Sequence, residues 1–220
     1  MPHTVDDWTM PVGEQRDLLQ GTLQLPAAPE GVVVFVHGSG SSHLSPRNRF
    51  VAAALGRAGF ATLLFDLLTG EEAEDRRNVF DIPLLADRTA AACGALGRDP
   101  RTRALPLGLF GASTGAAAAL VAATALGDAV RAIVSRGGRP DLAGAALGAV
   151  RAPTLLVVGG EDPDVLALNR AAASAMRGTV ELVVIPGASH LFEEPGALEA
   201  VTRHACAWFR RWLAAGAGAP

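Results

Sequence analysis

The chain has 220 residues, a formal net charge of −3 and an apolar content of 50%, which is typical of one globular domain spanning 1–220 with a large core. Its 19 basic residues are all arginine and form no basic block or aromatic-interleaved patch, which argues against nucleic-acid binding. The polar, acidic start is unlike a signal peptide, and no apolar run reaches the roughly 18 residues of a membrane span, so we expect a cytoplasmic protein without membrane contacts. Two cysteines, Cys93 and Cys206, provide neither a disulfide framework nor a metal site.

The first half of the chain alternates apolar runs of strand length with helical patterns. We expect residues 1–14 to be a loosely held lead-in, and the leucines of 18–25 to form a short antiparallel edge hairpin around Gly21. The β-branched run at 32–36 is typical of a strand buried on both faces. After it the patterns predict, in order, a helix at 46–57, a strand at 61–65, a solvated loop rich in Glu and Arg at 70–78, and a helix at 82–96.

The second half continues this alternation to the last helix. An apolar stripe at 201–213 lies at helical spacing and belongs either to the core or to a contact with a second copy, which would make a homodimer. The tail at 214–220 is expected to fray. The other elements predicted here are strands at 105–110, 131–134, 153–158 and 180–185, and helices at 114–126, 142–147 and 165–176.

Strands that alternate with helices predict an α/β fold. We expect a mostly parallel, twisted sheet of about seven strands with helices on both faces and right-handed crossovers. Only about 18 residues separate the strands at 131–134 and 153–158, which leaves no room there for a large lid and favours an open site. In such sheets, binding sites form beyond the carboxyl ends of the strands. Candidate reactive residues are therefore sought in the loops that leave each strand.

The strand at 105–110 runs directly into the pentapeptide Gly-Ala-Ser-Thr-Gly at 111–115, and an Ala-rich helix follows. This strand–turn–helix context is typical of a nucleophile elbow, in which a sharp turn exposes the hydroxyl of Ser113 at the end of the sheet. Flanking glycines allow the strand and the helix to approach closely. The sequence therefore predicts that Ser113 is a catalytic nucleophile.

A serine hydroxyl needs a base, and the base needs an acid that fixes its tautomer. His190 leaves the last predicted strand in Gly-Ala-Ser-His, and Asp162 leaves the preceding one in Gly-Gly-Glu-Asp, with Glu161 and Asp164 as competing acids. The chain order serine, acid, histidine is the order expected of an α/β-hydrolase arrangement. We therefore predict a triad of Ser113, Asp162 and His190.

The oxyanion of an acyl intermediate requires backbone N–H donors. Thr114, at the start of the helix after Ser113, supplies one of them. The loop after 32–36 should supply the other, with Ser39 the first candidate and Gly40 the second, while Gly38 and Gly40 allow close approach of the acyl group. In the same loop His37 is expected to anchor the backbone, and His43 is a candidate to line the site.

Arginines in or near the strand-exit loops raise the question of substrate charge. A guanidinium suits planar anions, so one or more of these residues is a candidate to bind a substrate carboxylate or phosphate. Surface ion pairing, for instance with Asp66 or Asp141, explains them equally well. The candidates are Arg47, Arg49, Arg136 and Arg139.

The motifs at 37–41, 111–115, 159–162 and 187–190 together resemble an α/β-hydrolase of the dienelactone hydrolase-like group. Phrases at 45–49, 64–68 and 135–141 resemble a bacterial subgroup sometimes fused to a phosphoribosyltransferase domain, and we expect no such domain in these 220 residues. The resemblance implies hydrolysis of an ester, thioester or lactone through an acyl-enzyme, without a cofactor. Dienelactone hydrolase itself has a cysteine nucleophile where this chain has Ser113, so its substrate is not carried over.

The sequence thus favours a serine hydrolase that acts on a small-molecule ester, thioester or lactone, with no metal and no cofactor. Two other functions remain open at this point. An acyltransferase or cyclase would use the same acyl-enzyme with water excluded, and a non-catalytic binding module would use the fold alone. The sequence indicates the chemistry of bond cleavage better than it indicates the substrate.

Overall fold

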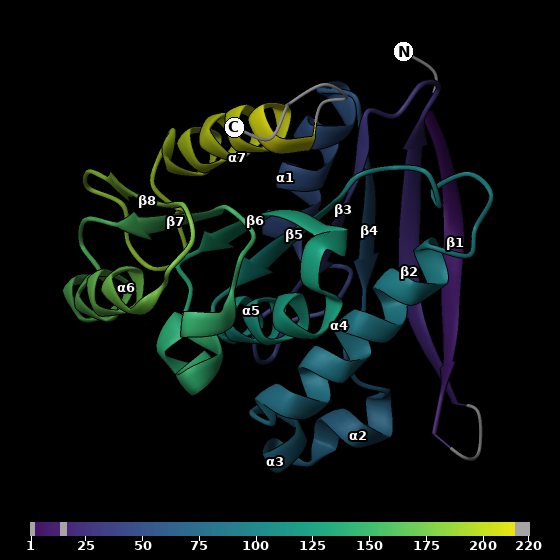
Figure 1. Cartoon of the computed structure of the whole chain (residues 1–220), viewed down its shortest axis with the longest axis horizontal. Coiled ribbons are helices and arrows are strands. Elements are labelled where there is room, and N and C mark those ends of the chain that lie inside the picture. Colours follow the sequence, from purple (N-terminus) through teal and green to yellow (C-terminus); the bar gives the residue numbers. More distant parts are fainter. Residues whose placement is uncertain (1–2, 14–16, 214–220) are drawn as a thin grey trace.

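Eight strands form one sheet in the computed structural model, which describes residues 3–13 and 17–213 (Figure 1). The sheet order is β1-β2-β4-β3-β5-β6-β7-β8. The six strands β4, β3, β5, β6, β7 and β8 are parallel to one another, whereas β2 is antiparallel to both β1 and β4. The strands are β1 (His3–Val12), β2 (Asp17–Pro26), β3 (Gly31–Val36), β4 (Phe60–Phe65), β5 (Leu107–Ala112), β6 (Val130–Arg136), β7 (Thr154–Gly159) and β8 (Val180–Ile185).

Helices cover both faces of this sheet, with α1 and α7 on one side and α4 and α5 on the other (Figure 1). Their bounds are α1 (Pro46–Arg57), α2 (Gly70–Glu74), α3 (Arg76–Val79), α4 (Ile82–Leu96), α5 (Thr114–Leu126), α6 (Pro163–Ala175) and α7 (Ala197–Leu213), with 3₁₀ helices η1 (Gly127–Ala129) and η2 (Pro140–Ala149). The predicted α/β architecture is therefore confirmed, with one strand more than expected. The short η2 occupies the connection between β6 and β7, where the sequence leaves no room for a large lid.

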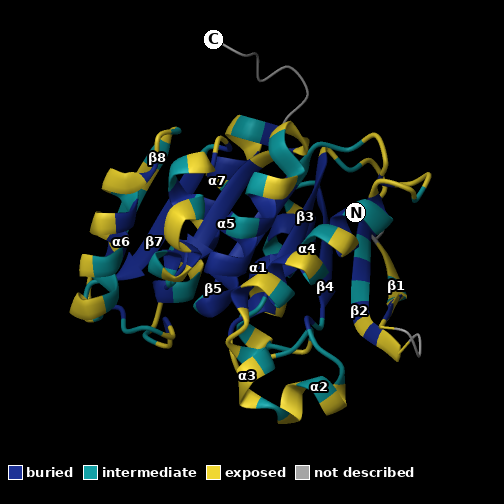
Figure 2. Cartoon of the chain, turned by 60° about the horizontal axis from the view of Figure 1, so that its bottom comes forward, coloured by how far each residue is buried: buried dark blue, intermediate teal, exposed yellow. Residues whose placement is uncertain are grey.

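The central strands are buried on both faces, as continuous apolar runs predict. Every residue of β3, β4 and β7 is buried (Figure 2). Side chains that point to one face join a core cluster with α4 and α5, and those that point to the other face join a cluster with α1 and α7. The sheet thus separates two apolar layers and holds the strand ends in fixed positions.

The main helices begin at residues that satisfy their free N–H groups. Ser45 caps α1 by accepting a hydrogen bond from the N–H of Asn48 at 3.4 Å, and Asp81 caps α4 in the same way from Leu84 at 3.0 Å. A proline follows each cap within the first two positions, where its missing N–H costs nothing. These signals explain why the predicted bounds of both helices agree with the structure.

The N-terminal segment corrects the sequence prediction. Residues 3–12 are not a lead-in but the edge strand β1, paired with the whole of β2 from His3–Pro26 to Val12–Asp17. An antiparallel pair is present at this edge of the sheet, as predicted, but β1 and β2 form it and 17–26 is one continuous strand. The hydrophobic pattern does not indicate β1, because this strand buries few apolar side chains. Its Trp8 packs edge-on against Phe65, with ring centroids 5.7 Å apart, Met10 and Val12 are buried in the core, and all ten of its residues pair with β2.

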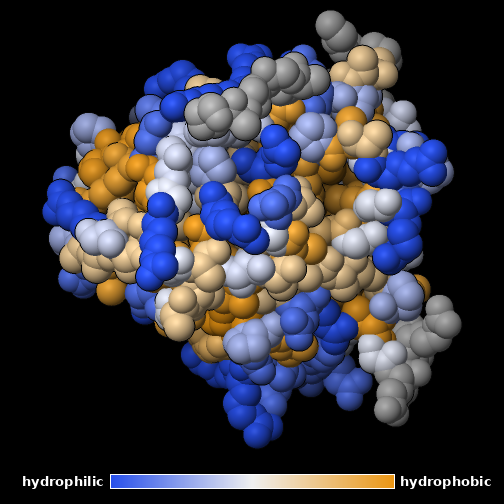
Figure 3. Space-filling view, in the orientation of Figure 1, coloured by the Kyte–Doolittle hydropathy of each residue, from blue (hydrophilic) through white to orange (hydrophobic). Residues whose placement is uncertain are grey.

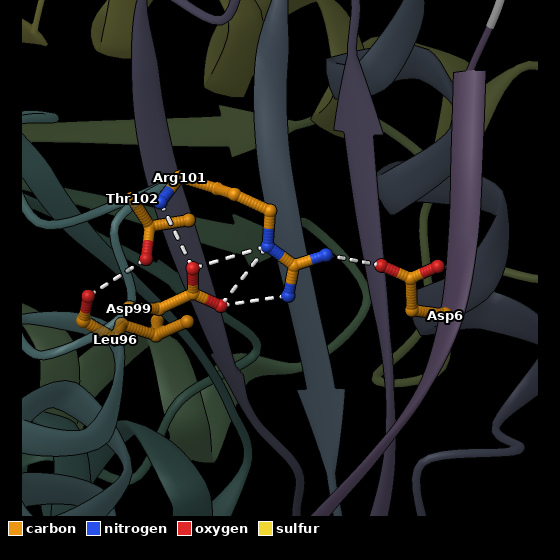
Figure 4. A network of polar contacts seen from close by, with 5 residues as sticks. All are labelled: Asp6, Leu96, Asp99, Arg101 and Thr102. Carbon is orange, nitrogen blue, oxygen red and sulfur yellow. Dashed lines mark hydrogen bonds and ion pairs between the residues drawn. The ribbon is translucent and has the colours of Figure 1, made fainter.

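An ion-pair network fastens this edge strand to the connection between α4 and β5 (Figure 4). The guanidinium of Arg101 binds Asp99 through Nε and Nη2 and reaches Asp6 of β1 through Nη1. The two carboxylates raise the pKa of Arg101 above its ordinary value. Beside it, the hydroxyl of Thr102 donates to the carbonyl oxygen of Leu96 at 2.7 Å.

The predicted solvated loop at 70–78 is also corrected, because it forms the short helices α2 and α3. Thr69 and Glu72 make a reciprocal capping box, and Asp75 caps α3. The segment projects beyond α4, and hydrophilic side chains gather on it at the bottom of Figure 3. The exposed surface was predicted correctly, but the capping signals within it were overlooked.

The apolar stripe of α7 belongs to the core. Val201, Trp208 and Phe209 are buried against the sheet together with residues of α1. Phe209 lies so close to β5 that a Cβ on Gly108 would come within 2.7 Å of its ring. Within residues 3–13 and 17–213, no helix combines the length and the apolar character needed to cross a bilayer.

Replacing Phe209 by alanine should lower the free energy of unfolding by about 3–5 kcal/mol, because a fully buried aromatic ring leaves a cavity. Urea denaturation measures the loss. Arg203→Ala, on the exposed face of the same helix, is the control and should change stability by about 0.5 kcal/mol or less. Equal effects of the two substitutions would contradict this assignment of the core.

Candidate active site

The loops that leave the parallel strands β3, β5, β6, β7 and β8 meet at one edge of the sheet, because parallel strands end on the same side. The β3 loop carries His37 to Ser42, β5 leads to Ser113, and the exits of β7 and β8 carry Asp162 and His190. The topology therefore brings together residues that lie up to 153 positions apart, from 37 to 190. The contacts below show how closely they meet.

Ser113 joins β5 to α5 and has a backbone conformation that side chains rarely adopt, with φ 50° and ψ −124°. Its N–H donates to the carbonyl oxygen of Arg136 at 3.2 Å, and its own carbonyl oxygen accepts from the N–H of Arg139 at 3.0 Å. Arg136 ends the neighbouring strand β6, and Arg139 lies in the loop that follows it. The strained residue is thus held from outside its own turn, as in the nucleophile elbow that the sequence predicts.

Two glycines allow the strand and the helix to approach around Ser113. A Cβ on Gly111 would lie 2.5 Å from Cα of Ala116, and one on Gly115 would lie 2.2 Å from the carbonyl oxygen of Val36. Both distances are far shorter than a carbon atom tolerates. Any side chain at these positions would separate β5 from α5 or α5 from the β3 loop.

His190 is paired with an acid. Its Nδ1–H donates to Oδ2 of Asp162 at 2.7 Å, whereas the competitors Glu161 and Asp164 are exposed. The side chain of Asp162 is 16% exposed and that of His190 is 38% exposed, so the acid lies beneath the histidine. Because the carboxylate accepts from Nδ1–H, the contact fixes the orientation of the ring and leaves Nε2 outside this hydrogen bond.

The ring of His190 lies over the β6 exit, next to the elbow. A Cβ on Gly137 would lie 3.6 Å from Cε1 of His190, and Gly137 follows Arg136, whose carbonyl oxygen holds Ser113. No hydrogen bond joins Ser113 Oγ to His190 in the described part of the chain. Such contacts are often long in free enzymes and shorten when substrate binds.

The candidate oxyanion donors lie on both sides of Ser113. The N–H of Thr114 opens α5, where the first turn has no carbonyl partner of its own. The N–H of Ser39 donates to the hydroxyl of Thr114 at 2.9 Å, so it is not free in this conformation. The β3 loop nevertheless packs against Ser113, since a Cβ on Gly38 would lie 2.9 Å from Cβ of Ser113.

His37 fastens this loop by two hydrogen bonds. Its Nδ1–H donates to the carbonyl oxygen of Gly38 at 2.9 Å, and its Nε2 accepts from the N–H of Leu67 at 3.1 Å. Burial lowers the pKa of His37 below its ordinary value of 6.5, because desolvation outweighs the raising effects of Gly38 and Asp66. The neutral ring therefore links the exits of β3 and β4.

His43 also makes a histidine–carboxylate pair. Its Nδ1–H donates to Asp66 Oδ2 at 2.8 Å, and its backbone N–H donates to Oδ1 of the same carboxylate at 2.7 Å. This pair closes the loop that begins at His37. The pair of His43 and Asp66 therefore fixes the path of the chain from the β3 loop into α1.

A cavity of about 240 Å³ opens beside the β3 loop, called the oxyanion loop below because it holds the candidate oxyanion donors Ser39 and Gly40. One wall is the β3 loop from His37 to Ser42, and the other is the segment after β4, including Leu67, Thr69 and Val79. Sequence reasoning missed this second wall, since it interpreted 70–78 as a solvated loop. The capping box of Thr69 and Glu72 is the sequence signal that indicates a helix, and so an ordered wall, in this segment.

The candidate arginines differ sharply in their surroundings. Arg139 is paired with Asp141 through two hydrogen bonds of 2.9 and 2.7 Å, and Arg47 is paired with Glu193 at 3.0 Å. Arg49 is exposed on α1. Arg136 alone among these four is buried.

The sequence profile of the dienelactone hydrolase family matches residues 19–215. The chain belongs to the dienelactone hydrolase family. A member of known structure, dienelactone hydrolase from Anabaena variabilis, is 52% identical, covers 95% of this chain and 99% of its own, and superimposes with a TM-score of 0.90. The esterase domain of a Rhodothermus marinus protein shares the fold with 21% identity, a TM-score of 0.76 and coverage of 96% and 99%.

A protein of Mycobacterium tuberculosis is 61% identical over 189 residues, which are 86% of this chain and 43% of that protein. It carries the name "Putative phosphoribosyl transferase". The chain thus spans less than half the length of this curated relative. The name agrees with the subgroup that the phrases at 45–49, 64–68 and 135–141 indicate. Membership of the dienelactone hydrolase family supports a hydrolase activity.

Gly38→Ala tests the packing of the β3 loop on Ser113. The added methyl group would meet Ser113 Cβ at 2.9 Å and Ala112 O at 3.0 Å, and should lower kcat on a chromogenic ester by about 10–100-fold by displacing the serine. Gly148→Ala is the control, because its methyl group would meet only Ala175 O at 3.8 Å. Unchanged kcat in Gly38→Ala would contradict the close approach.

The pH dependence of stability tests His37. Below pH 6.5 the unfolded chain binds a proton that folded His37, with its lowered pKa, does not bind, so its contribution to stability falls as pH falls. Urea denaturation of the wild type between pH 7 and 5 should show this fall, with a slope of at most about 1.4 kcal/mol per pH unit from one group.

His37→Asn should have a shallower slope than the wild type. The exposed His204→Asn is the control and should keep the wild-type slope. Identical slopes in the wild type and His37→Asn would show that His37 titrates normally in the folded protein.

Proposed function

We propose that this protein is a serine hydrolase that cleaves the ester, thioester or lactone bond of a small molecule through a covalent acyl-enzyme. The observation that carries the proposal is the 2.7 Å hydrogen bond from His190 to Asp162, formed at the same sheet edge as the strained Ser113. A partly buried carboxylate beneath a half-exposed histidine is the arrangement that activates a serine. Membership of a hydrolase family supports the same chemistry.

In this proposal Ser113 Oγ attacks the carbonyl carbon of the substrate while His190 Nε2 removes the hydroxyl proton. The proton then passes from His190 to the leaving alcohol or thiol, and the acyl group stays on Ser113 as an ester. Water, deprotonated by the same histidine, attacks this ester, releases the acid and restores the serine. Asp162 keeps its negative charge throughout and stabilises the imidazolium.

The oxyanion of each tetrahedral intermediate is stabilised by the N–H of Thr114 and by one N–H of the β3 loop. Ser39 is the first candidate for the second donor, and it must exchange its hydrogen bond to the Thr114 hydroxyl for one to the oxyanion. Gly40 in the same loop is the alternative. The positive end of α5 adds to the stabilisation.

The cavity beside the oxyanion loop is the proposed binding pocket for one side of the substrate. Its volume of about 240 Å³ suits a small acyl or alkyl group. Its walls combine the serines of the loop with the apolar Leu67, Leu68 and Val79. A short apolar chain that bears an oxygen substituent fits this lining better than a long fatty chain does.

Ser113→Ala should lower kcat on small esters by about 10⁴-fold or more, and Asp162→Asn should lower it substantially, because the residues act as a unit. Steady-state kinetics on a panel of acyl esters, thioesters and lactones measures both effects. Ser174→Ala, which removes an exposed hydroxyl of α6 bonded only to the Arg170 carbonyl oxygen, is the control and should retain full activity.

Near-normal turnover by Ser113→Ala would refute the mechanism. The same assays, repeated with an added alcohol or amine acceptor, distinguish hydrolysis from acyl transfer. Acid as the main product supports the proposal, whereas the acceptor ester or amide as the main product indicates an acyltransferase.

A further inference from the structure

Arg136 ends β6 one strand away from the nucleophile. Its carbonyl oxygen accepts a hydrogen bond from the N–H of Ser113 at 3.2 Å, and the residue is 8% exposed. Side chains alternate along a strand, and the preceding Ala132 and Val134 are buried in the cluster that contains residues of α1 and α7. The guanidinium of Arg136 therefore lies under α1, just below the edge where the site forms.

This buried guanidinium has almost no partner. Nη2 donates to Oδ1 of Asn48 over a long 3.5 Å, while Nε and Nη1 are buried without any hydrogen bond in the described part of the chain. No carboxylate pairs with it there, in contrast to Arg139, which Asp141 neutralises. Burial lowers the pKa of Arg136 to about 10, so it remains charged at neutral pH.

A second guanidinium and the N-terminus of a helix lie close to Arg136. Asn48 and Arg47 belong to the first turn of α1, a 12-residue helix with no acidic residue in that turn. The charge of Arg47 is the second cause of the lowered pKa of Arg136, after burial. The positive end of the helix, Arg47 and Arg136 therefore converge at one place.

The loop that carries His190 borders this place from the other side. Glu193 of that loop pairs with Arg47 at 3.0 Å, and a Cβ on Gly137 would lie 3.1 Å from the His190 carbonyl oxygen. The unpaired guanidinium thus lies between the first turn of α1, the His190 loop and the elbow. An anion bound there would be attached to, or part of, a molecule held at Ser113.

A purely structural role does not explain this arrangement. An uncompensated buried charge destabilises a fold, and an apolar side chain of similar volume usually stabilises it. One long hydrogen bond to Asn48 uses one donor of the five that a guanidinium has. The remaining donors form a planar fork that suits the two oxygens of a carboxylate or a phosphate.

We propose that Arg136, with Arg47 and the first turn of α1, is an anion-binding subsite that takes a carboxylate or phosphate group of the substrate. The subsite deepens the proposed function and rests on it for the identity of the bond that is cleaved. It makes the preferred substrate a small ester, thioester or lactone with a second, negatively charged group. Of the four candidate arginines, the structure thus singles out Arg136 as the principal ligand.

Anion binding is tested first, without turnover. The melting temperature of the full chain is measured in sodium acetate, in sodium phosphate and in sodium chloride of equal ionic strength, for wild type, Arg136→Met and Arg131→Met. Arg131 lies at the exposed start of the same strand and is the control. Wild type and Arg131→Met should gain stability with rising acetate or phosphate, beyond the effect of chloride, and Arg136→Met should not.

The two anions distinguish the two chemistries. A shift with acetate alone assigns a carboxylate, a shift with phosphate alone assigns a phosphate, and both results support the subsite. No shift in the wild type, or an equal shift in Arg136→Met, overturns it. Without added anion, Arg136→Met should melt at a higher temperature than the wild type, because it removes an unpaired buried charge.

Kinetics on matched esters then tests the link to catalysis. For Arg136→Met, KM for the 4-nitrophenyl hemiester of succinic acid should rise about 10–100-fold, while KM for 4-nitrophenyl butyrate changes little. Equal changes for the two esters overturn the proposal. If no ester is hydrolysed by the wild type while anions still stabilise it through Arg136, the proposed hydrolase function fails and the anion subsite stands.

Discussion

Ser113 is held at φ 50° and ψ −124°, a conformation that costs about 1–3 kcal/mol for a residue with a side chain. The rest of the site depends on this single residue. Hydrogen bonds with Arg136 and Arg139 fix it from β6, while Gly111 and Gly115 allow α5 to lie against β5 and the β3 loop. A side chain at Gly111 or Gly115 would push α5 away from β5 or from the end of β3, and the turn that carries Ser113 would have to move.

The order of the strands places two kinds of charge on the two sides of this serine. On the β7–β8 side the carboxylate of Asp162 lies beneath His190 and accepts a hydrogen bond from its Nδ1–H at 2.7 Å. On the α1 side the guanidinium of Arg136 is buried without a counter-charge. In the proposed reaction, Asp162 and His190 carry out the proton transfers of acyl chemistry. Arg136, on the other side, binds an anionic substituent of the same substrate. One sheet edge thus supports both the proposed reaction and the proposed selectivity.

The sequence predicted most elements well where burial on both faces leaves a continuous apolar run, as at β3, or where caps define a helix, as at α1 and α4. It failed at β1, because a strand held by backbone pairing on an edge needs few apolar residues. It also failed at α2 and α3, which depend on short capping signals. The motifs predicted which side chains share the sheet edge. The missing partner of Arg136 was beyond prediction, since it depends on every side chain that packs around it.

The central claim is that Ser113 is the nucleophile of an acyl-transfer reaction. The most direct measurement is treatment of the native protein with a fluorophosphonate, which reacts with activated serines, followed by mass spectrometry of the intact chain and of its peptides. Our account predicts one covalent adduct, on Ser113, with parallel loss of hydrolase activity. An active protein that stays unlabelled, or that carries the adduct on another serine while Ser113 is unmodified, would contradict it.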